Sequence, residues 1–128
     1  MNAYLASSPR AYREAAVLTA TGEQLIVMLY DGARRFLYQA GVAMADKNIE
    51  LSHNKLRRAE LIVVHLRDTL DLEQGGELAL RLRSIYLFCE WHMQQARFER
   101  DPSKLEEVSQ LLGQLREAWA EIAGANER

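Results

Sequence analysis

The chain has 128 residues, a formal net charge of −2 and a single cysteine. This length suits one domain with its own core, the interspersed charges argue against a nucleic-acid or anionic-membrane partner, and one cysteine excludes an internal disulfide framework. Only two prolines and seven glycines accompany abundant Leu, Ala, Glu, Arg and Gln, a composition that favours an all-α chain.

Residues 1–20 lack helical periodicity and are rich in alanine, serine and threonine. We expect a flexible N-terminal arm here, with Tyr12 and Val17 as apolar hooks that dock on the rest of the protein at least transiently. Thr21 then offers a helix N-cap, and Gln24 follows at the spacing of a capping box.

Four amphipathic stretches follow the arm, with connections of only a few residues. We expect helices over residues 22–45, 49–70, 76–99 and 102–123, with Gly75 and Gly76 as a turn before the third and Asp101–Pro102 as the start of the fourth. Helices of about 22 residues joined by short connections pack antiparallel. The predicted fold is an all-α, antiparallel up-down four-helix bundle over residues 21–124, with a disordered tail at 125–128.

The third predicted helix carries two apolar stripes, whereas a bundle helix needs one. Leu82, Cys89 and Met93 mark the first stripe, which also includes Leu78, Ile85 and Ala96. The second stripe lies on the opposite side of the helix and consists of Leu80, Leu87, Trp91 and Phe98. Either neighbouring helices cover both stripes, or the second stripe is a docking surface. The small number of helices favours docking.

The first two helices carry weaker outward-facing apolar sets. These are Val27, Tyr38 and Val42 on the first helix, and Leu61 and Val64 on the second. The interior stripe of the first helix is expected to run through Leu25, Leu29, Ala33, Phe36, Ala40 and Ala43. Tyr30 and Trp119 lie close to core-facing positions, so we assign them to packing.

Motifs for catalysis or metal binding are weak. A di-iron bundle needs two Glu-x-x-His pairs, and only Glu50 with His53 has that spacing. Cys89 and His92 could share a metal ion, but a structural zinc needs four ligands. A phosphotransfer role for His65 or His53 has little local support. We therefore predict a protein that is not an enzyme and uses no cofactor or metal. With no signal-peptide pattern and no apolar run near 18 residues, we expect it in the cytosol.

Several blocks of the chain, in this order and spacing, resemble the FliS family of flagellar secretion chaperones. The most specific block is Met28–Ala33, in the family's MLYDGA register. The others include Tyr12, Val17, Thr19 and Ala20; Leu70, Asp71, Glu73, Gly75, Gly76 and Glu77; Ile85 and Tyr86; and Leu111, Leu112, Leu115, Arg116, Ala118 and Trp119. One departure is Leu87, where the family commonly has an acidic residue.

The resemblance implies a helical bundle that holds the disordered C-terminal segment of flagellin, prevents premature polymerisation and assists delivery to the flagellar type III export apparatus. It also implies presentation of the complex to the cytosolic domain of the flagellar export gate. The outward-facing apolar sets would then bind flagellin, and the arm would compete with it for a groove. The alternatives are a helical adaptor or self-associating bundle whose extra apolar face makes a homodimer, and a metal-dependent bundle enzyme.

Overall fold

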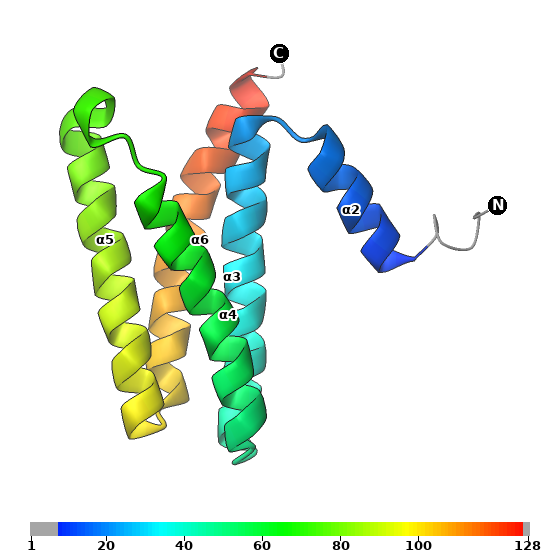
Figure 1. Cartoon of the computed structure of the whole chain (residues 1–128), viewed down its shortest axis with the longest axis vertical. Helices are drawn as coiled ribbons and strands as arrows, with labels where there is room; N and C mark the ends of the chain where they lie inside the picture. Colours follow the sequence, from blue (N-terminus) through cyan, green and yellow to red (C-terminus); the bar gives the residue numbers. More distant parts are fainter. Residues whose placement is uncertain (1–7, 127–128) are drawn as a thin grey trace.

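The computed structural model describes residues 8–126, which are helical apart from short connections (Figure 1). The elements are α2 (Pro9–Thr19), α3 (Gly22–Ala45), α4 (Ile49–Asp68), α5 (Leu72–Glu99) and α6 (Pro102–Asn126). The predicted all-α class is therefore confirmed. The expected tail at 125–128 is wrong for residues 125 and 126, because α6 continues to Asn126, and residues 127–128 lie outside the described part.

The body of the protein consists of α3, α4, α5 and α6. Helix α3 packs extensively against both α4 and α6, and α5 makes a smaller contact with the same two helices. Successive helices of the body run in opposite directions in Figure 1, while α2 projects away from them. The helix α5 is therefore attached on one side only, and its other side faces away from the body.

Local capping explains where the helices begin. The Thr21 hydroxyl accepts a hydrogen bond from the Gln24 amide (3.2 Å), and the Gln24 side chain accepts one from the Thr21 amide (2.9 Å). This capping box confirms the predicted start of α3. Within the expected arm, residues 9–19 form the helix α2, which the lack of periodicity did not predict: the Ser8 side chain accepts a hydrogen bond from the Ala11 amide and Pro9 follows it, and both favour a helix start. The flexibility of the arm stays a prediction. Residues 1–7 lie outside the described part.

The start of α5 also differs from the prediction. Helical structure begins at Leu72 rather than residue 76, because the Asp71 carboxylate accepts hydrogen bonds from the Glu73 and Gln74 amides (3.1 and 3.0 Å). Gly76 then interrupts the helix with φ 54° and ψ −135°. Glycine adopts a positive φ without the steric cost that a Cβ imposes. The predicted turn is therefore a kink within the helix, and it lies at Gly76.

A pair of phenols lies within the apolar core. Tyr30 of α3 and Tyr86 of α5 are almost fully buried, and their hydroxyl groups hydrogen bond to each other. Burial raises the pKa of both phenols, so both remain neutral. They belong to one core cluster with large buried side chains from all four helices, namely Leu37, Leu56, Val63, Met93, Leu105, Val108 and Leu112.

The inner face of α3 differs in part from its predicted stripe. Tyr30 and Leu37 are buried, whereas Leu25 is exposed and Phe36 is only half-buried. The reason is that α3 packs against both α4 and α6. The side of α3 that faces the core therefore lies between its contacts with these two helices. Trp119 packs partly buried against this core, consistent with the packing role assigned to it.

The Tyr30–Tyr86 hydrogen bond predicts a specific non-additivity in stability. Tyr86→Phe removes a partner from a buried hydroxyl, so we expect it to lower the free energy of unfolding by about 1–3 kcal/mol. Tyr30→Phe combined with Tyr86→Phe removes both partners and should cost less than the sum of the single changes. Urea unfolding followed by circular dichroism measures all three, with exposed Tyr38→Phe as the control. Strictly additive effects would show that the bond does not couple the two helices.

Candidate partner-binding surface

The outer face of α5 carries a row of exposed apolar side chains. Trp91 is 56% exposed and Phe98 is 86% exposed, while Leu80 and Leu87 are exposed by about half or less. None of the four is covered by the rest of the protein. The interpretation of α5 as a helix covered on both sides is therefore wrong. The docking role of this stripe stays a prediction.

The inner face of α5 and its two flanks hold the helix in this orientation. Leu82, Cys89, Met93 and Ala96 are buried against the other helices. On one flank, Glu90 accepts two hydrogen bonds from Arg67 of α4 (2.6 and 3.0 Å). These contacts turn the second stripe toward solvent, because a helix can present only one side to its neighbours.

An ion pair and a hydrogen bond complete the attachment of α5. Arg97 forms a two-point contact with Glu60 of α4, one arm of which spans 3.2 Å. On the other flank, His92 Nε2 pairs with Glu107 of α6. Such polar contacts are directional, so they fix the rotation of the helix more strictly than apolar packing does.

Two apolar residues of α5 outside the predicted outer stripe are also exposed. Leu78, predicted in the interior, is 67% exposed and lies two residues after the kink at Gly76. Phe88 is about half exposed and stacks on His92, with ring centroids 5.0 Å apart. Phe88 lies on neither predicted stripe. In the sequence, only its large apolar side chain and its position in the helix indicate that it could be part of an exposed surface.

The other predicted binding residues lie on different sides of the body. Leu61 of α4 is exposed and Val64 is half-buried. Tyr38 and Val42 of α3 are exposed and line a shallow hollow of about 260 Å³ between α3 and α6, with Pro102 in its wall. Val27 is half-buried in a second hollow of about 440 Å³, lined by α2, α3 and α6. The predicted sets are therefore not one patch.

The apolar hooks of the arm are also exposed. Tyr12 is 73% exposed, Val17 is about half exposed, and no residue of α2 is buried. In the described structure neither side chain occupies a groove of the body, and α2 projects outward (Figure 1). Docking of the arm therefore stays a prediction.

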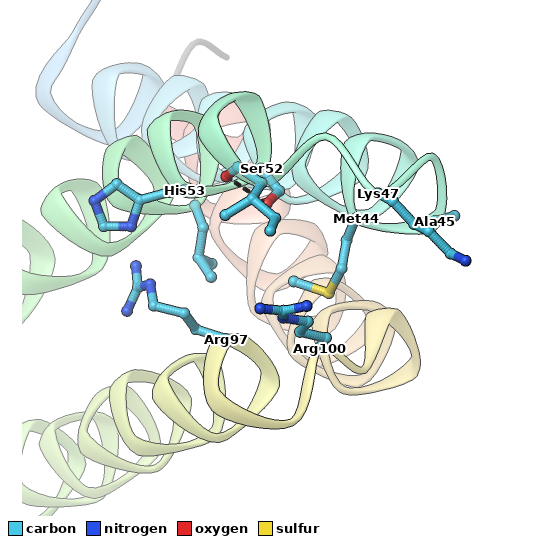
Figure 2. Close-up of a pocket in the computed structure, with 9 residues that line it drawn as sticks. Met44, Ala45, Lys47, Ser52, His53, Arg97 and Arg100 are labelled. Atoms are coloured by element: carbon cyan, nitrogen blue, oxygen red, sulfur yellow. Dashed lines mark hydrogen bonds between the residues drawn. The ribbon is translucent and has the colours of Figure 1, made fainter.

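A pocket that the sequence did not suggest lies at the end of the body where α3 connects to α4 and α5 connects to α6. It measures about 600 Å³, and its apolar lining includes Met44, Ile49 and Leu56. Figure 2 shows Arg97 and Arg100, from the end of α5, extending toward His53 of α4 and Met44 of α3. This pocket joins an apolar lining with cationic side chains.

Reactive chemistry is weakly represented among residues 8–126. Within this range no group of three or more His, Cys, Asp or Glu side chains is placed to hold a metal ion. Cys89 is fully buried, and burial raises the pKa of its thiol to about 12. His92 is paired with Glu107 instead of sharing a ligand with Cys89. None of the described helices is long and apolar enough to cross a membrane.

These features define a helical protein with exposed apolar side chains on several of its helices. A family model described as "Flagellar protein FliS" matches residues 5–126. The flagellar secretion chaperone FliS of Salmonella typhimurium is 35% identical over 125 residues, which cover 94% of this chain and 93% of that protein. The chain belongs to the FliS family of flagellar secretion chaperones.

Other relatives agree with this assignment. FliS of Vibrio cholerae is 31% identical over 119 residues, covering 90% of this chain and 88% of that protein. The chaperone FliSB of Pseudomonas aeruginosa is 36% identical over 110 residues, covering 86% and 87%. The resemblance read from the sequence is confirmed, and the protein has a chaperone role in flagellar export.

The raised pKa of Cys89 predicts a chemically silent thiol. At pH 8, a pKa of about 12 leaves about one thiol in ten thousand ionised, and only the thiolate is strongly nucleophilic. We expect no reaction with Ellman's reagent in the native protein at pH 8 and one reactive thiol per chain in 6 M guanidinium chloride. Absorbance at 412 nm measures both. Rapid labelling of the native protein would contradict the buried position of Cys89.

Proposed function

We propose that this protein is a cytosolic export chaperone that binds the disordered C-terminal segment of flagellin. The observation that carries the proposal is the exposed row Leu80, Leu87, Trp91 and Phe98 on a helix whose inner face is already occupied. Membership of the FliS family supports a flagellar substrate. The chaperone would keep the segment from polymerising before export and assist its delivery to the flagellar type III export apparatus.

The binding mode we propose is an amphipathic segment laid over several faces of an up-down four-helix bundle formed by α3–α6. Partner helices with apolar side chains three and four residues apart would fit along α5, as in other helix-in-groove complexes. Extended stretches between them would reach Leu61 and Val64 on α4, and Val27, Tyr38 and Val42 on α3. Because these residues lie on different sides of the body, a flexible segment can reach them all, whereas a rigid face reaches only one.

The energetics of this mode suit a carrier that must release its cargo. A segment that orders on binding loses about 2–5 kcal/mol of the gross interaction energy to conformational entropy. The net affinity is therefore moderate even with a large buried area. In this proposal the loaded chaperone is presented to the cytosolic domain of the export gate, and neither a cofactor nor catalysis takes part.

Replacing the central aromatic residue of the stripe tests this function. Trp91→Asp puts a charge into the proposed interface, and a buried aromatic anchor carries a large share of binding energy. We expect at least about a 100-fold loss of affinity for a peptide of the flagellin C-terminal segment, measured by isothermal titration calorimetry. The circular dichroism spectrum should stay helical, because Trp91 is exposed.

The matched control is Gln114→Asp, which adds the same charge at an exposed position of α6. It should bind the peptide with unchanged affinity. Unchanged binding by Trp91→Asp would refute the proposed site. Sedimentation at several concentrations, with and without the peptide, covers the alternative: a dimer that persists when the peptide is added and is lost in Trp91→Asp would show that the stripe is a homodimer interface.

We further propose that the arm competes with the partner for an apolar groove, through Tyr12 and Val17. Both side chains are exposed on a helix that projects from the body, so a docked arm would cover apolar surface at little structural cost. Deleting residues 1–18 should then raise peptide affinity by about twofold or more, because a larger fraction of molecules is binding-competent. Stopped-flow fluorescence measures the association rate, which should rise as well.

The substitution pair Tyr12→Ser and Val17→Ser serves as a second test, because it keeps the chain length. It should change the association rate in the same direction as the deletion. Identical kinetics for the full-length, deleted and doubly substituted proteins would rule out competition by the arm.

A further inference from the structure

The end pocket described above has no assigned role, and its composition points to a definite ligand chemistry. It combines an apolar lining with the side chains of Arg97, Arg100 and His53. No Asp or Glu is among the residues that line it. Its volume of about 600 Å³ lies within the range of about 300–1,000 Å³ common for ligand sites.

The charges in the pocket are only partly neutralised by the protein itself. Glu60 pairs with the terminal nitrogens of Arg97, but the Nε atom of Arg97 is buried without a hydrogen-bond partner in the described part of the chain. Arg100 and His53 form no ion pair within residues 8–126. The acids that flank Arg100 are engaged elsewhere, since Glu99 pairs with Lys104 (2.6 Å) and Asp101 accepts a hydrogen bond from Ser103 (2.6 Å).

The backbone holds Arg100 at this position. It is the C-cap of α5 with φ 54° and ψ 47°, the left-handed conformation that closes many helices. The cap amide donates to the carbonyl of Ala96, so the chain turns there and directs Arg100 toward α3 and α4 rather than along the helix axis. A glycine or asparagine adopts this conformation at lower cost than arginine. Capping therefore does not explain why this residue is an arginine, and we look for a separate role for its side chain.

We propose that this pocket binds a carboxylate side chain of the partner, flanked by apolar residues, within the disordered C-terminal segment of flagellin. The proposal rests on the function proposed above and adds a second, electrostatic contact to it. Charge complementarity selects an anion, and the planar guanidinium groups fit the two oxygens of a carboxylate. The apolar side chains Met44, Ile49 and Leu56 select a chain that presents apolar groups next to that carboxylate, rather than a fully hydrated inorganic ion.

This contact would fix the register of the bound segment. Apolar stripes tolerate sliding by one helical turn, because leucine and similar side chains replace one another at modest cost. A carboxylate that enters a cationic pocket has only one favourable position. The end pocket would therefore align the partner relative to the stripe on α5, whose last member, Phe98, lies two residues before Arg100 in the chain.

The test removes the Arg100 charge without disturbing the fold. Arg100→Asn suits the left-handed backbone, while Arg100→Lys keeps a cation and should retain most of the affinity. The control is Arg81→Gln, which removes an exposed arginine from the other half of α5. The probe is the synthetic C-terminal segment of flagellin from the same organism, studied by isothermal titration calorimetry at two salt concentrations. Of these variants, only Arg100→Asn should bind the peptide about tenfold more weakly than the native protein. The difference in affinity should be smaller at high salt.

Substitutions in the peptide identify the carboxylate. Each Asp or Glu is changed in turn to Asn or Gln, and one change should weaken binding to the native protein about tenfold. The same change should have little further effect on Arg100→Asn, because both remove the same contact. If every peptide change adds fully to Arg100→Asn, the inference is overturned.

The other outcomes are separable from failure of the proposed function. If Arg100→Asn binds like the native protein while Trp91→Asp does not bind, the partner site on α5 stands and the end pocket is not part of it. Inorganic phosphate at 10 mM gives a further test. If it lowers the peptide affinity of the native protein and of Arg100→Asn equally, the end pocket does not bind anions specifically, which counts against the proposal. A change in self-association on substitution of Arg100, without a change in peptide affinity, would assign the pocket to a second copy and overturn the proposal.

Discussion

The rotation of α5 about its own axis is the constraint on which the rest of this surface depends. The helix has an apolar stripe on each of two opposite sides, so hydrophobic burial alone would accept either side toward the core. Glu90 with Arg67, Glu60 with Arg97, and His92 with Glu107 are flanking pairs that form in only one of these orientations. The buried phenols add a fourth directional contact. Polar contacts therefore decide which apolar stripe remains outside.

The fold could be predicted wherever the controlling interactions are local. The capping box at Thr21 involves neighbours three residues apart, so the sequence alone locates the start of α3. The errors at α2 and α5 have the same local origin: Ser8–Pro9 and Asp71 are helix-start signals, but the alanine-, serine- and threonine-rich composition around the first and the glycine pair after the second obscured them. The inner face of α3 was misjudged at Leu25 and Phe36 because that face depends on the angle between two neighbouring helices.

The candidate surface likewise has one part that the sequence predicts and one part that it does not. The stripe on α5 is a periodic feature of one helix, so residues seven and four apart are enough to find it. The end pocket combines Met44, His53 and Arg100, which come from three segments far apart in the chain. No periodicity links these residues, and their meeting depends on the directions of the connections at one end of the body. A pocket of this kind becomes visible only in three dimensions.

The distribution of uncovered apolar residues also bears on what kind of partner the surface suits. A folded partner would match one broad face, and its apolar contacts would gather there. Here the uncovered apolar side chains are spread over the outer side of α5, the exposed side of α4, and the hollow between α3 and α6. A disordered segment can follow such a path at the cost of its own conformational entropy. In the binding mode proposed above, that cost would limit affinity and so favour release of the bound segment.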